Sequence, residues 1–324
     1  MSSDTLSDVL RAVRLNGAIF FSIDASAPWV AETPPGVALA PHVLGGVEHV
    51  IEYHVVTSGS CWGGIVDEPA VPLETGDVIV FPQGDPHVLA SAPGMRGHAD
   101  LDLHRSTAAA GLPVAISHRG GGEPVSVICG FLGCDARPFN PLLATLPRVI
   151  HVRQRDATDG VLRSFVDLAL AECTAKRSGG QSVLARLSEL LFIEVVRRYV
   201  ATLPSEHAGW LAGLRDELVG RALQRLHERP AHPWTLEALG KEVGMSRSML
   251  AERFVHFVGI PPMQYLAQWR IQLAASLLRS TTATLAEIAD RVGYGSEAAL
   301  SHAFKRLVGV APAPYRQGAR RRTT

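Results

Sequence analysis

The chain has 324 residues, of which 31 are basic, 31 are acidic and 47% are hydrophobic. This length is enough for two domains, and the composition excludes disordered, fibrous and wholly polybasic proteins. No apolar run approaches the ~18 residues of a membrane span, Asp4 and Asp8 stand where a secretion signal would be basic, and four cysteines are too few for a disulfide framework. We therefore expect a cytoplasmic protein with no membrane partner.

Short apolar runs bounded by Gly and Pro fill the chain up to about residue 152, which is typical of strands and turns. Within this part, residues 76–87 (GDVIVFPQGDPH) have the spacing Gly-x5-Pro-x-Gly-x2-His and end at His87. The segment resembles the second motif of the cupins, which are small β-barrels whose motif residues face inward and often bind a divalent metal. The first cupin motif is incomplete, because Gly46 and Glu48 stand where the family has His-x-His.

The resemblance predicts a pocket in the barrel. We expect a small organic molecule there, lined by Glu52, His54, Trp62 and His87, and no cofactor. A divalent metal is one alternative, with Glu48, Glu52, His54 and His87 as candidate ligands, because the first three share strand parity. A barrel that binds nothing is the other alternative.

From about residue 161 the apolar residues recur at helical spacing. Val161, Phe165, Leu168 and Ala169 form one stripe, and a second stripe includes Leu184, Leu187, Leu190, Leu191 and Val195. We expect two antiparallel helices, which either cover the barrel or form the interface of a homodimer. The segment from residue 204 to 214 reads as a linker.

The last hundred residues contain an internal repeat. Leu250, Phe254, Gly259, Pro262 and Tyr265 recur fifty positions later. Each copy predicts a helix, a tight turn at a glycine, and a second helix whose first residue follows a capping serine. The helix expected between the copies, residues 262–278, is roughly 25 Å long at ~1.5 Å per residue. Two modules at that distance suit successive major grooves of DNA, about 34 Å apart.

Charge supports this interpretation. From Arg215 onward there are 16 basic and 9 acidic residues, a net charge of +7, which leaves −7 for the rest of the chain. A basic part joined to an acidic part suggests that only the C-terminal part meets a polyanion.

Residues 288–294 (IADRVGY), 304–309 (FKRLVG) and 312–316 (PAPYR) carry a specific resemblance to the AraC/XylS family of bacterial transcription regulators. The resemblance covers about residues 218–317 and implies two helix-turn-helix units in one domain. We expect the reading helices over residues 247–254 and 297–306. The side chains expected to meet DNA are Arg247, Ser248, Ala251, Glu252, Glu297, Ala298, Ser301, His302, Lys305, Arg306 and Arg316; the last three are candidates for phosphate contacts, and the others for base edges.

Residues 59–62, Cys129-Gly130 and residues 141–147 resemble the cupin-type sensor domain of one AraC subgroup, some members of which are redox sensors. Cys129 and Cys134 are therefore candidate redox residues, which would pair if the glycines between them bend the chain. The alternative is that both are buried and unreactive.

The whole pattern predicts an α+β chain of two domains. These are an N-terminal cupin-like β-barrel with a helical pair (residues 1–203) and a C-terminal all-α domain with two helix-turn-helix units (215–324). The predicted function is a sequence-specific transcription regulator, not an enzyme, that is controlled by a small molecule or a redox signal. Its expected partners are double-stranded DNA, RNA polymerase and an effector. The alternatives are a metal-dependent cupin enzyme with an attached DNA-binding domain, and a regulator without an effector.

Overall fold

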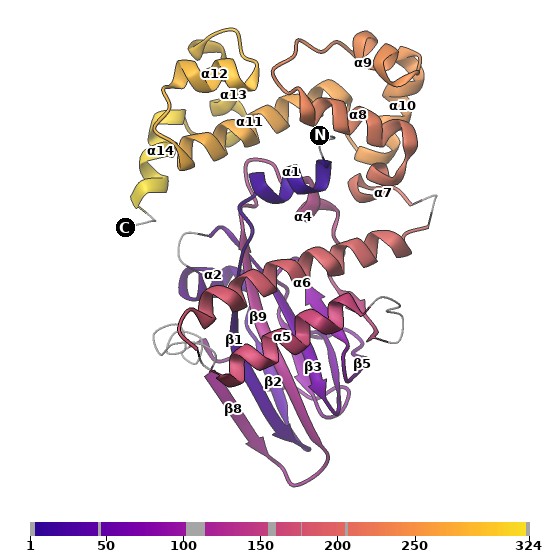
Figure 1. The fold of residues 1–324 in the computed structure, drawn as a ribbon, viewed down its shortest axis with the longest axis vertical. Helices are drawn as coiled ribbons and strands as arrows, with labels where there is room; N and C mark the ends of the chain where they lie inside the picture. Colours follow the sequence, from indigo (N-terminus) through magenta and orange to yellow (C-terminus); the bar gives the residue numbers. More distant parts are fainter. Residues whose placement is uncertain are drawn as a thin grey trace. The chain divides into compact units, whose positions relative to one another are not determined.

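A computed structural model describes residues 4–44, 47–101, 114–154, 160–175, 177–204 and 207–321. The chain divides into two compact units (Figure 1). The β unit comprises Leu15–Cys134 and Leu146–Thr202, and the helical unit comprises Met1–Arg14, Asp135–Thr145 and Leu203–Thr324. The expected fold class is confirmed. In the described part of the chain, no helix is both long and apolar enough to cross a membrane.

The β unit is built on two sheets. The six-stranded sheet has the order β10 (Ile150–Val152), β6 (Val78–Phe81), β3 (His49–Ser58), β9 (Pro124–Cys134), β1 (Asn16–Ser26) and β8 (Val114–Arg119). The four-stranded sheet has the order β2 (Val30–Thr33), β7 (His87–Ala90), β4 (Ser60–Ile65) and β5 (Val71–Glu74). All pairs are antiparallel except β1 with β8. Apolar residues of both sheets form one core, which includes Phe21, Ile79, Leu89 and Phe131.

Among the described residues, three helices belong to the β unit: α2 (Gly36–Val43), α5 (Val161–Ala175) and α6 (Gly180–Thr202). Figure 1 shows α5 and α6 side by side along the six-stranded sheet. On α6, Ser188 bonds the buried Tyr53 hydroxyl of β3, O to O at 2.6 Å. The face expected for α5 is wrong by about one position, because Leu162, Val166 and Ala169 are buried whereas Val161 and Leu168 are exposed.

The helical unit holds ten helices among the described residues. They are α1 (Thr5–Ala12), α4 (Pro141–Thr145), α7 (Trp210–Arg215), α8 (Glu217–Glu228), α9 (Leu236–Val243), α10 (Arg247–Val258), α11 (Pro262–Ser280), α12 (Leu285–Val292), α13 (Glu297–Val308) and α14 (Pro312–Arg321). The long α11 runs between the pair α9–α10 and the pair α12–α13 (Figure 1). Its buried Tyr265 contacts Phe254 of α10, its buried Trp269 stacks on His227 of α8, and Ala275 and Leu278 share a core with α12 and α13.

The unit boundaries differ from the sequence-based ones in two places. The expected linker, residues 204–214, contains most of α7, whose Trp210 is 1% exposed and donates from Nε1 to the Tyr265 hydroxyl at 2.9 Å. Burying such an apolar helix in the unit stabilises the folded state, whereas leaving it exposed as a linker would not. Ser205 and Glu206 of that linker lie outside the described residues.

The second difference is that α1 and the segment Asp135–Thr145 belong to the helical unit. The Asp135 carboxylate, 1% exposed, accepts from Arg14 of the N-terminal segment at 2.9 Å and from Arg279 of α11 at 2.5 Å. Gln272 of α11 donates to the Ala12 carbonyl at 2.9 Å. Because these buried polar partners are far apart in sequence, local patterns do not reveal them.

Candidate nucleic-acid interface and barrel cavity

Two helix-turn-helix modules repeat each other in backbone detail. Thr235 and Thr284 cap α9 and α12, and Thr284 also forms the expected capping box with Glu287. Both helices end at a glycine in the left-handed conformation, Gly244 at φ +78° and Gly293 at φ +84°, where side chains are disfavoured. Ser246 and Ser296 then cap the second helix of each module through their side-chain oxygens.

The second helices, α10 and α13, begin at the expected residues, Arg247 and Glu297. Each buries its Leu and Phe at i, i+4, which turns the opposite face outward. The structure brings ten of the eleven expected reading residues onto these two outward faces. Exposed are Arg247, Ser248, Glu252, Glu297, Ala298, His302, Lys305 and Arg306, and half-buried are Ala251 and Ser301.

Arg316 of α14 is placed differently. Its side chain is half-buried and donates from Nη2 to the Ala283 carbonyl at 2.5 Å, so it holds the start of the second module. Sequence reasoning also missed Met249, which is 54% exposed on α10. Its apolar side chain resembled a core residue, and only the register relative to Leu250 shows that it faces outward.

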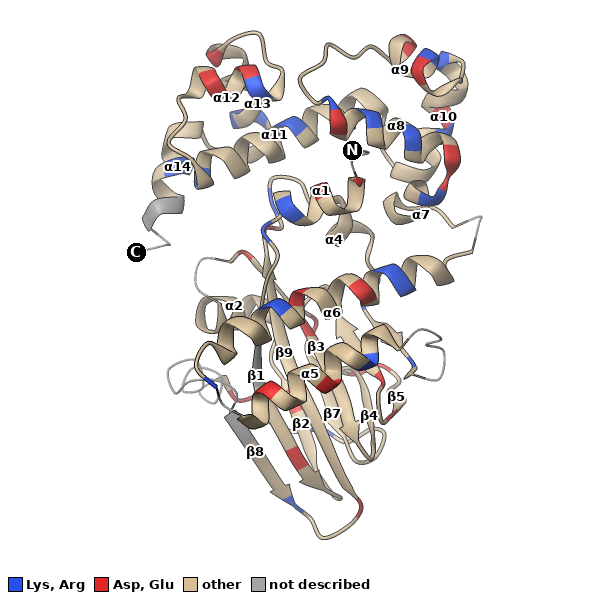
Figure 2. Cartoon of the chain, viewed as in Figure 1, with Lys and Arg blue, Asp and Glu red and all other residues tan. Residues whose placement is uncertain are grey.

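Charge on the helical unit is mixed rather than uniformly basic. Figure 2 shows Lys and Arg on α8, α10, α11 and α13, with acidic residues between them. Several of these cations are engaged within the unit, as Arg253 is with Asp216, the N-cap of α8. Lys305 and Arg306, in the last turn of α13, form no ion pair with any residue that the structure describes, which suits contact with phosphate groups.

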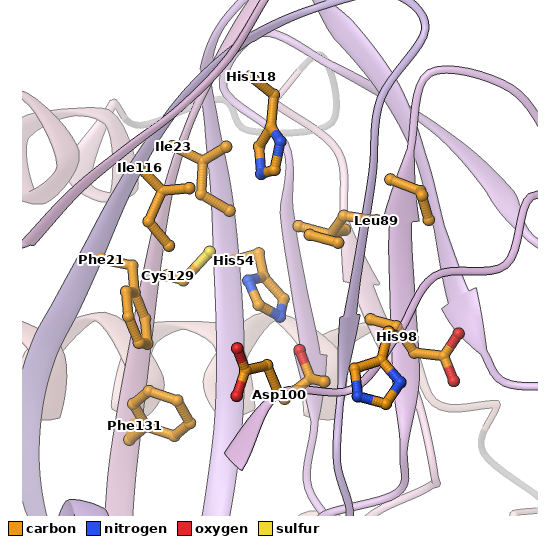
Figure 3. Close-up of a pocket in the computed structure, with 14 residues that line it drawn as sticks. Phe21, Ile23, His54, Leu89, His98, Asp100, Ile116, His118, Cys129 and Phe131 are labelled. Carbon is orange, nitrogen blue, oxygen red and sulfur yellow. The ribbon is translucent and has the colours of Figure 1, made fainter. Parts of the chain in front are cut away.

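The β unit contains a partly open cavity of about 250 Å³ (Figure 3). Its inner wall is apolar, with Phe21 and Ile23 from β1, Phe131 from β9, Leu89 from β7 and Ile116 from β8. Cys129 and His54 also line it. The polar residues Glu32, His98, Asp100 and His118 also line the cavity, as do Val30, Ala31 and Thr33.

Of the four residues expected to line a pocket, only His54 does so. Glu52 and His87 are fully buried next to it, behind the cavity wall. Trp62 does not line this cavity: it lines a separate groove with Asp67 and Arg96.

Glu52, His54 and His87 form a compact buried cluster. Nε2 of His54 and Nε2 of His87 are 2.7 Å apart, and the same His87 nitrogen is 3.7 Å from Oε2 of Glu52. The Phe81 ring stacks on His87 with centroids 3.9 Å apart. Burial raises the pKa of Glu52 well above its usual range, and burial together with the neighbouring His87 lowers the pKa of His54 well below its own.

These residues do not fit the metal centre that the cupin fold implies. The two imidazole nitrogens are hydrogen-bonded to each other, whereas ligands of one tetrahedral metal lie roughly 3.4 Å apart. Glu48 precedes β3 and is half-buried. In the ranges that the structure describes, no group of three or more His, Cys, Asp or Glu is arranged to hold a metal ion.

The candidate redox pair does not form. Cys129 and Cys134 are both buried on β9 and share no disulfide, because five residues of a strand span about 16 Å at ~3.3 Å per residue. That separation is far beyond the reach of a disulfide, so the condition for pairing, a bend at the glycines between them, is not met. Burial also raises the pKa of the Cys129 thiol well above its usual range, which disfavours the reactive thiolate.

Two helix-turn-helix modules on a common rod, joined in sequence to a cupin-like barrel, define the class of the protein, and comparisons agree. A family model described as "Cupin" matches residues 4–201, and one described as "Helix-turn-helix domain" matches residues 239–318. A putative AraC-like transcription regulator of Streptomyces lividans is 33% identical over 316 residues, which are 97% of this chain and 98% of that protein. Its counterpart in Streptomyces antibioticus is 34% identical over 318 residues, with the same shares covered.

Among solved structures, the DNA-binding domain of AdpA in complex with a target DNA is 30% identical and covers 33% of this chain and 96% of that chain, with a TM-score of 0.32. The chain belongs to the AraC-like transcription regulators, with a cupin domain ahead of the helix-turn-helix domain. It is therefore a regulator that binds double-stranded DNA through its C-terminal domain.

Proposed function

We propose that the β unit is a sensor: a small molecule enters the barrel cavity and changes how the two modules of the helical unit bind their DNA site, and through it how RNA polymerase uses the promoter. The observation that carries the proposal is the cavity itself, about 250 Å³ in volume, within a barrel that is covalently joined to a DNA-binding unit. An apolar pocket with a few polar groups is the usual form of a small-molecule site.

The connection between cavity and DNA-binding unit runs along the chain. Strand β9, whose Cys129 and Phe131 line the cavity, ends at Cys134, and the next residue is Asp135. Asp135 is bonded to Arg279 of α11, the rod between the modules. A shift of β9 on ligand binding is therefore transmitted to the rod, which changes which half-sites both modules reach at once.

The test uses the full-length protein and a DNA site that it selects from random sequences. A dialysable small-molecule extract of the source cells is expected to change the affinity for this site and the transcript yield in a purified transcription reaction. Ile116→Trp fills the cavity, so this variant is expected to bind DNA with an affinity that the extract no longer changes.

Ser117→Trp is the matched control, since Ser117 is the exposed neighbour of Ile116 on β8. It is expected to respond to the extract as the unmodified protein does. An equal response in both variants would contradict the proposal. Asp135→Asn is expected to keep ligand binding but to weaken its effect on DNA affinity, and an undiminished effect would exclude the route through α11.

We also propose a homodimer through the outer faces of α5 and α6. Val161 and Leu168 on α5, and Val183 and Leu190 on α6, are 37–48% exposed and seven positions apart within each helix, so each pair shares a face. Leu168→Glu combined with Leu190→Glu is expected to convert a dimer to a monomer in sedimentation analysis. A wild-type protein that is monomeric at micromolar concentration would refute this part of the proposal.

We propose finally that the barrel has no catalytic role and works without a resident metal. The hydrogen-bonded His54–His87 pair supports this, because it already occupies the nitrogens that a metal would need. Metal analysis of the purified protein is expected to find no stoichiometric metal. Stoichiometric iron or manganese would instead favour a metal-dependent cupin enzyme with an attached DNA-binding domain.

A further inference from the structure

The hydrogen-bonding pattern around His54 specifies what kind of molecule the cavity accepts. His54 is 4% exposed and part of the cavity wall, and its Nδ1 has no hydrogen-bond partner among the described residues. Figure 3 shows its imidazole between Phe21, Cys129 and Phe131 on one side and Leu89 and His98 on the other. A buried polar atom without a partner is costly, so it marks a place where a ligand gains free energy by bonding.

The proton on His54 follows from its neighbour. Nδ1 of His87 is 2.9 Å from the Asp85 carbonyl oxygen. A carbonyl only accepts, so this nitrogen carries the proton and donates it. In a neutral His87, Nε2 is then an acceptor, and Nε2 of His54, at 2.7 Å, must donate to it. Nδ1 of His54 is consequently the bare, accepting nitrogen of its ring.

The surroundings of the pair favour two neutral rings. Glu52, at 3.7 Å from His87, is fully buried, and burial raises the pKa of its carboxyl, which favours the uncharged form. Burial and the adjacent His87 lower the pKa of His54 well below its usual value. A proton added to the pair would be an uncompensated buried charge. His54 therefore offers the cavity an acceptor and not a cation.

The other residues that line the cavity also favour an uncharged ligand. No Lys or Arg lines the cavity in the part of the chain that the structure describes. Of the acidic lining residues, Glu32 is held by Arg96 through two hydrogen bonds of 2.9 and 3.0 Å, and Asp100 is exposed. Among the described lining residues, an anionic group would meet acidic side chains and no Lys or Arg.

Volume limits the size of the ligand. A cavity of about 150 Å³ lined by Leu, Ile and Phe suffices for benzene, so about 250 Å³ holds one substituted aromatic ring or an aliphatic molecule of similar bulk. The aromatic side chains of Phe21 and Phe131, with ring centroids 6.2 Å apart in an edge-to-face arrangement, provide a matching surface.

We propose that the cavity takes a compact, uncharged molecule with an apolar body and one hydrogen-bond donor, of the class of small phenols and alcohols, whose hydroxyl donates to Nδ1 of His54. This rests on the proposed function, in which the cavity is the effector site. According to this proposal, carboxylates are not the preferred ligands. His54 is the residue that distinguishes a ligand with a hydroxyl group from one with a methyl group at the same position.

The test compares three probes of similar shape on the full-length protein by calorimetry: p-cresol, p-xylene and p-toluate. p-Cresol is expected to bind most tightly, and p-xylene about tenfold more weakly because it lacks the donor. p-Toluate is expected to bind more weakly still. Equal affinity for p-cresol and p-xylene, tighter binding of p-toluate, or no binding of any probe at millimolar concentration would overturn the proposal.

His54→Phe keeps a ring of similar bulk and removes the acceptor. In this variant p-cresol and p-xylene are expected to bind equally. Leu89→Ala enlarges the cavity at its apolar wall and leaves His54 in place, so it is expected to retain the preference for p-cresol. A preserved preference in His54→Phe would contradict the role of His54. The wild-type probe series decides the matter even where that variant fails to fold.

The same probes separate this inference from the proposed function. If p-cresol binds more tightly than p-xylene but does not change the affinity for DNA, the proposed ligand class stands and the proposed sensor function is contradicted. A change in DNA affinity caused equally by all three probes would leave the sensor intact and refute the ligand class.

Discussion

At the scale of single residues, α13 separates two kinds of DNA contact. His302 and Lys305 are both exposed, one turn apart on the outward face. Lys305→Ala is expected to weaken binding to all sequences and to reduce the slope of log affinity against log salt by about 1, because one phosphate contact is lost. Salt titrations by fluorescence anisotropy measure this slope.

His302→Ala is expected to act differently. It should relax the preference at one base pair, a change on the order of 1–3 kcal/mol for that position, and leave the salt slope unchanged. Affinities for a set of singly substituted DNA sites measure it. Equal losses on every sequence from both variants would show that α13 does not lie in the major groove as described.

His227 of α8 ties stability to pH. It is buried, stacks on Trp269 at 4.1 Å, lies 2.8 Å from the Tyr265 hydroxyl and faces Asp8 at 3.8 Å. Burial lowers its pKa from 6.5 to about 3. Below pH 6.5 the unfolded chain therefore takes up a proton that the folded chain does not, and the free energy of unfolding falls by at most about 1.4 kcal/mol per pH unit.

The variant His227→Gln should remove this dependence. Between pH 7 and pH 5 the unmodified protein is expected to lose up to about 2 kcal/mol more than the variant does. Urea unfolding of the full chain, monitored by hydrogen exchange in α8 and α11, measures the difference. An identical loss in both proteins would mean that His227 accepts a proton within the folded unit.

Residue roles were predictable where they depend on local register. The spacing of Leu300 and Phe304 assigned the outward face of α13, and the structure places the expected residues there. Roles that depend on contacts between distant segments were not predictable. The bond from Arg316 to the Ala283 carbonyl and the position of Trp62 in another groove both follow from tertiary packing.

At the scale of elements, the two turn glycines differ in their surroundings although their backbones match. A Cβ on Gly244 would meet nothing within 4 Å, whereas one on Gly293 would lie 2.6 Å from Cα of Ala231. Gly244→Ala is expected to cost about 1 kcal/mol from its left-handed conformation alone. Gly293→Ala should cost clearly more, because backbone atoms must also move.

Thermal unfolding of the two single variants compares these costs within one protein, so each serves as the control for the other. Equal destabilisation would mean that the chain around Ala231 yields freely. The comparison also tests how far the two modules are energetically equivalent.

Elements that begin or end at recognisable capping and turn residues were predicted well. Elements whose place depends on contacts with distant segments were not. The caps, the glycine turns and the first residues of α10 and α13 follow from local signals, whereas the two helices end at Val258 and Val308, beyond the expected 254 and 306. The membership of α1 and Asp135–Thr145 in the helical unit depends on bonds to Arg279 and Gln272, more than 130 positions away in sequence. No periodicity encodes such a connection.

At the scale of the whole molecule, the two units have different tasks and the chain passes between them four times. It leaves the helical unit after Arg14, returns at Asp135, leaves again after Thr145 and returns at Leu203. The composition of the chain indicates one domain boundary, near residue 204, and does not reveal the other three crossings. Under the proposed function, these crossings give a ligand in the β unit a covalent route to the unit that contains α11.

The central claim is that α10 and α13 enter successive major grooves from one side of the duplex. The rod α11 has 19 residues and so a length of roughly 28 Å, which together with the width of the modules suits a separation of about 34 Å. A DNA-cleaving iron chelate attached at Ser248→Cys or Ser301→Cys, in a Cys173→Ser background that leaves only buried native thiols, reports where each helix lies. We predict two cleavage centres about 10 base pairs apart. Cleavage at a single position from both sites, or at none from either, would contradict the claim.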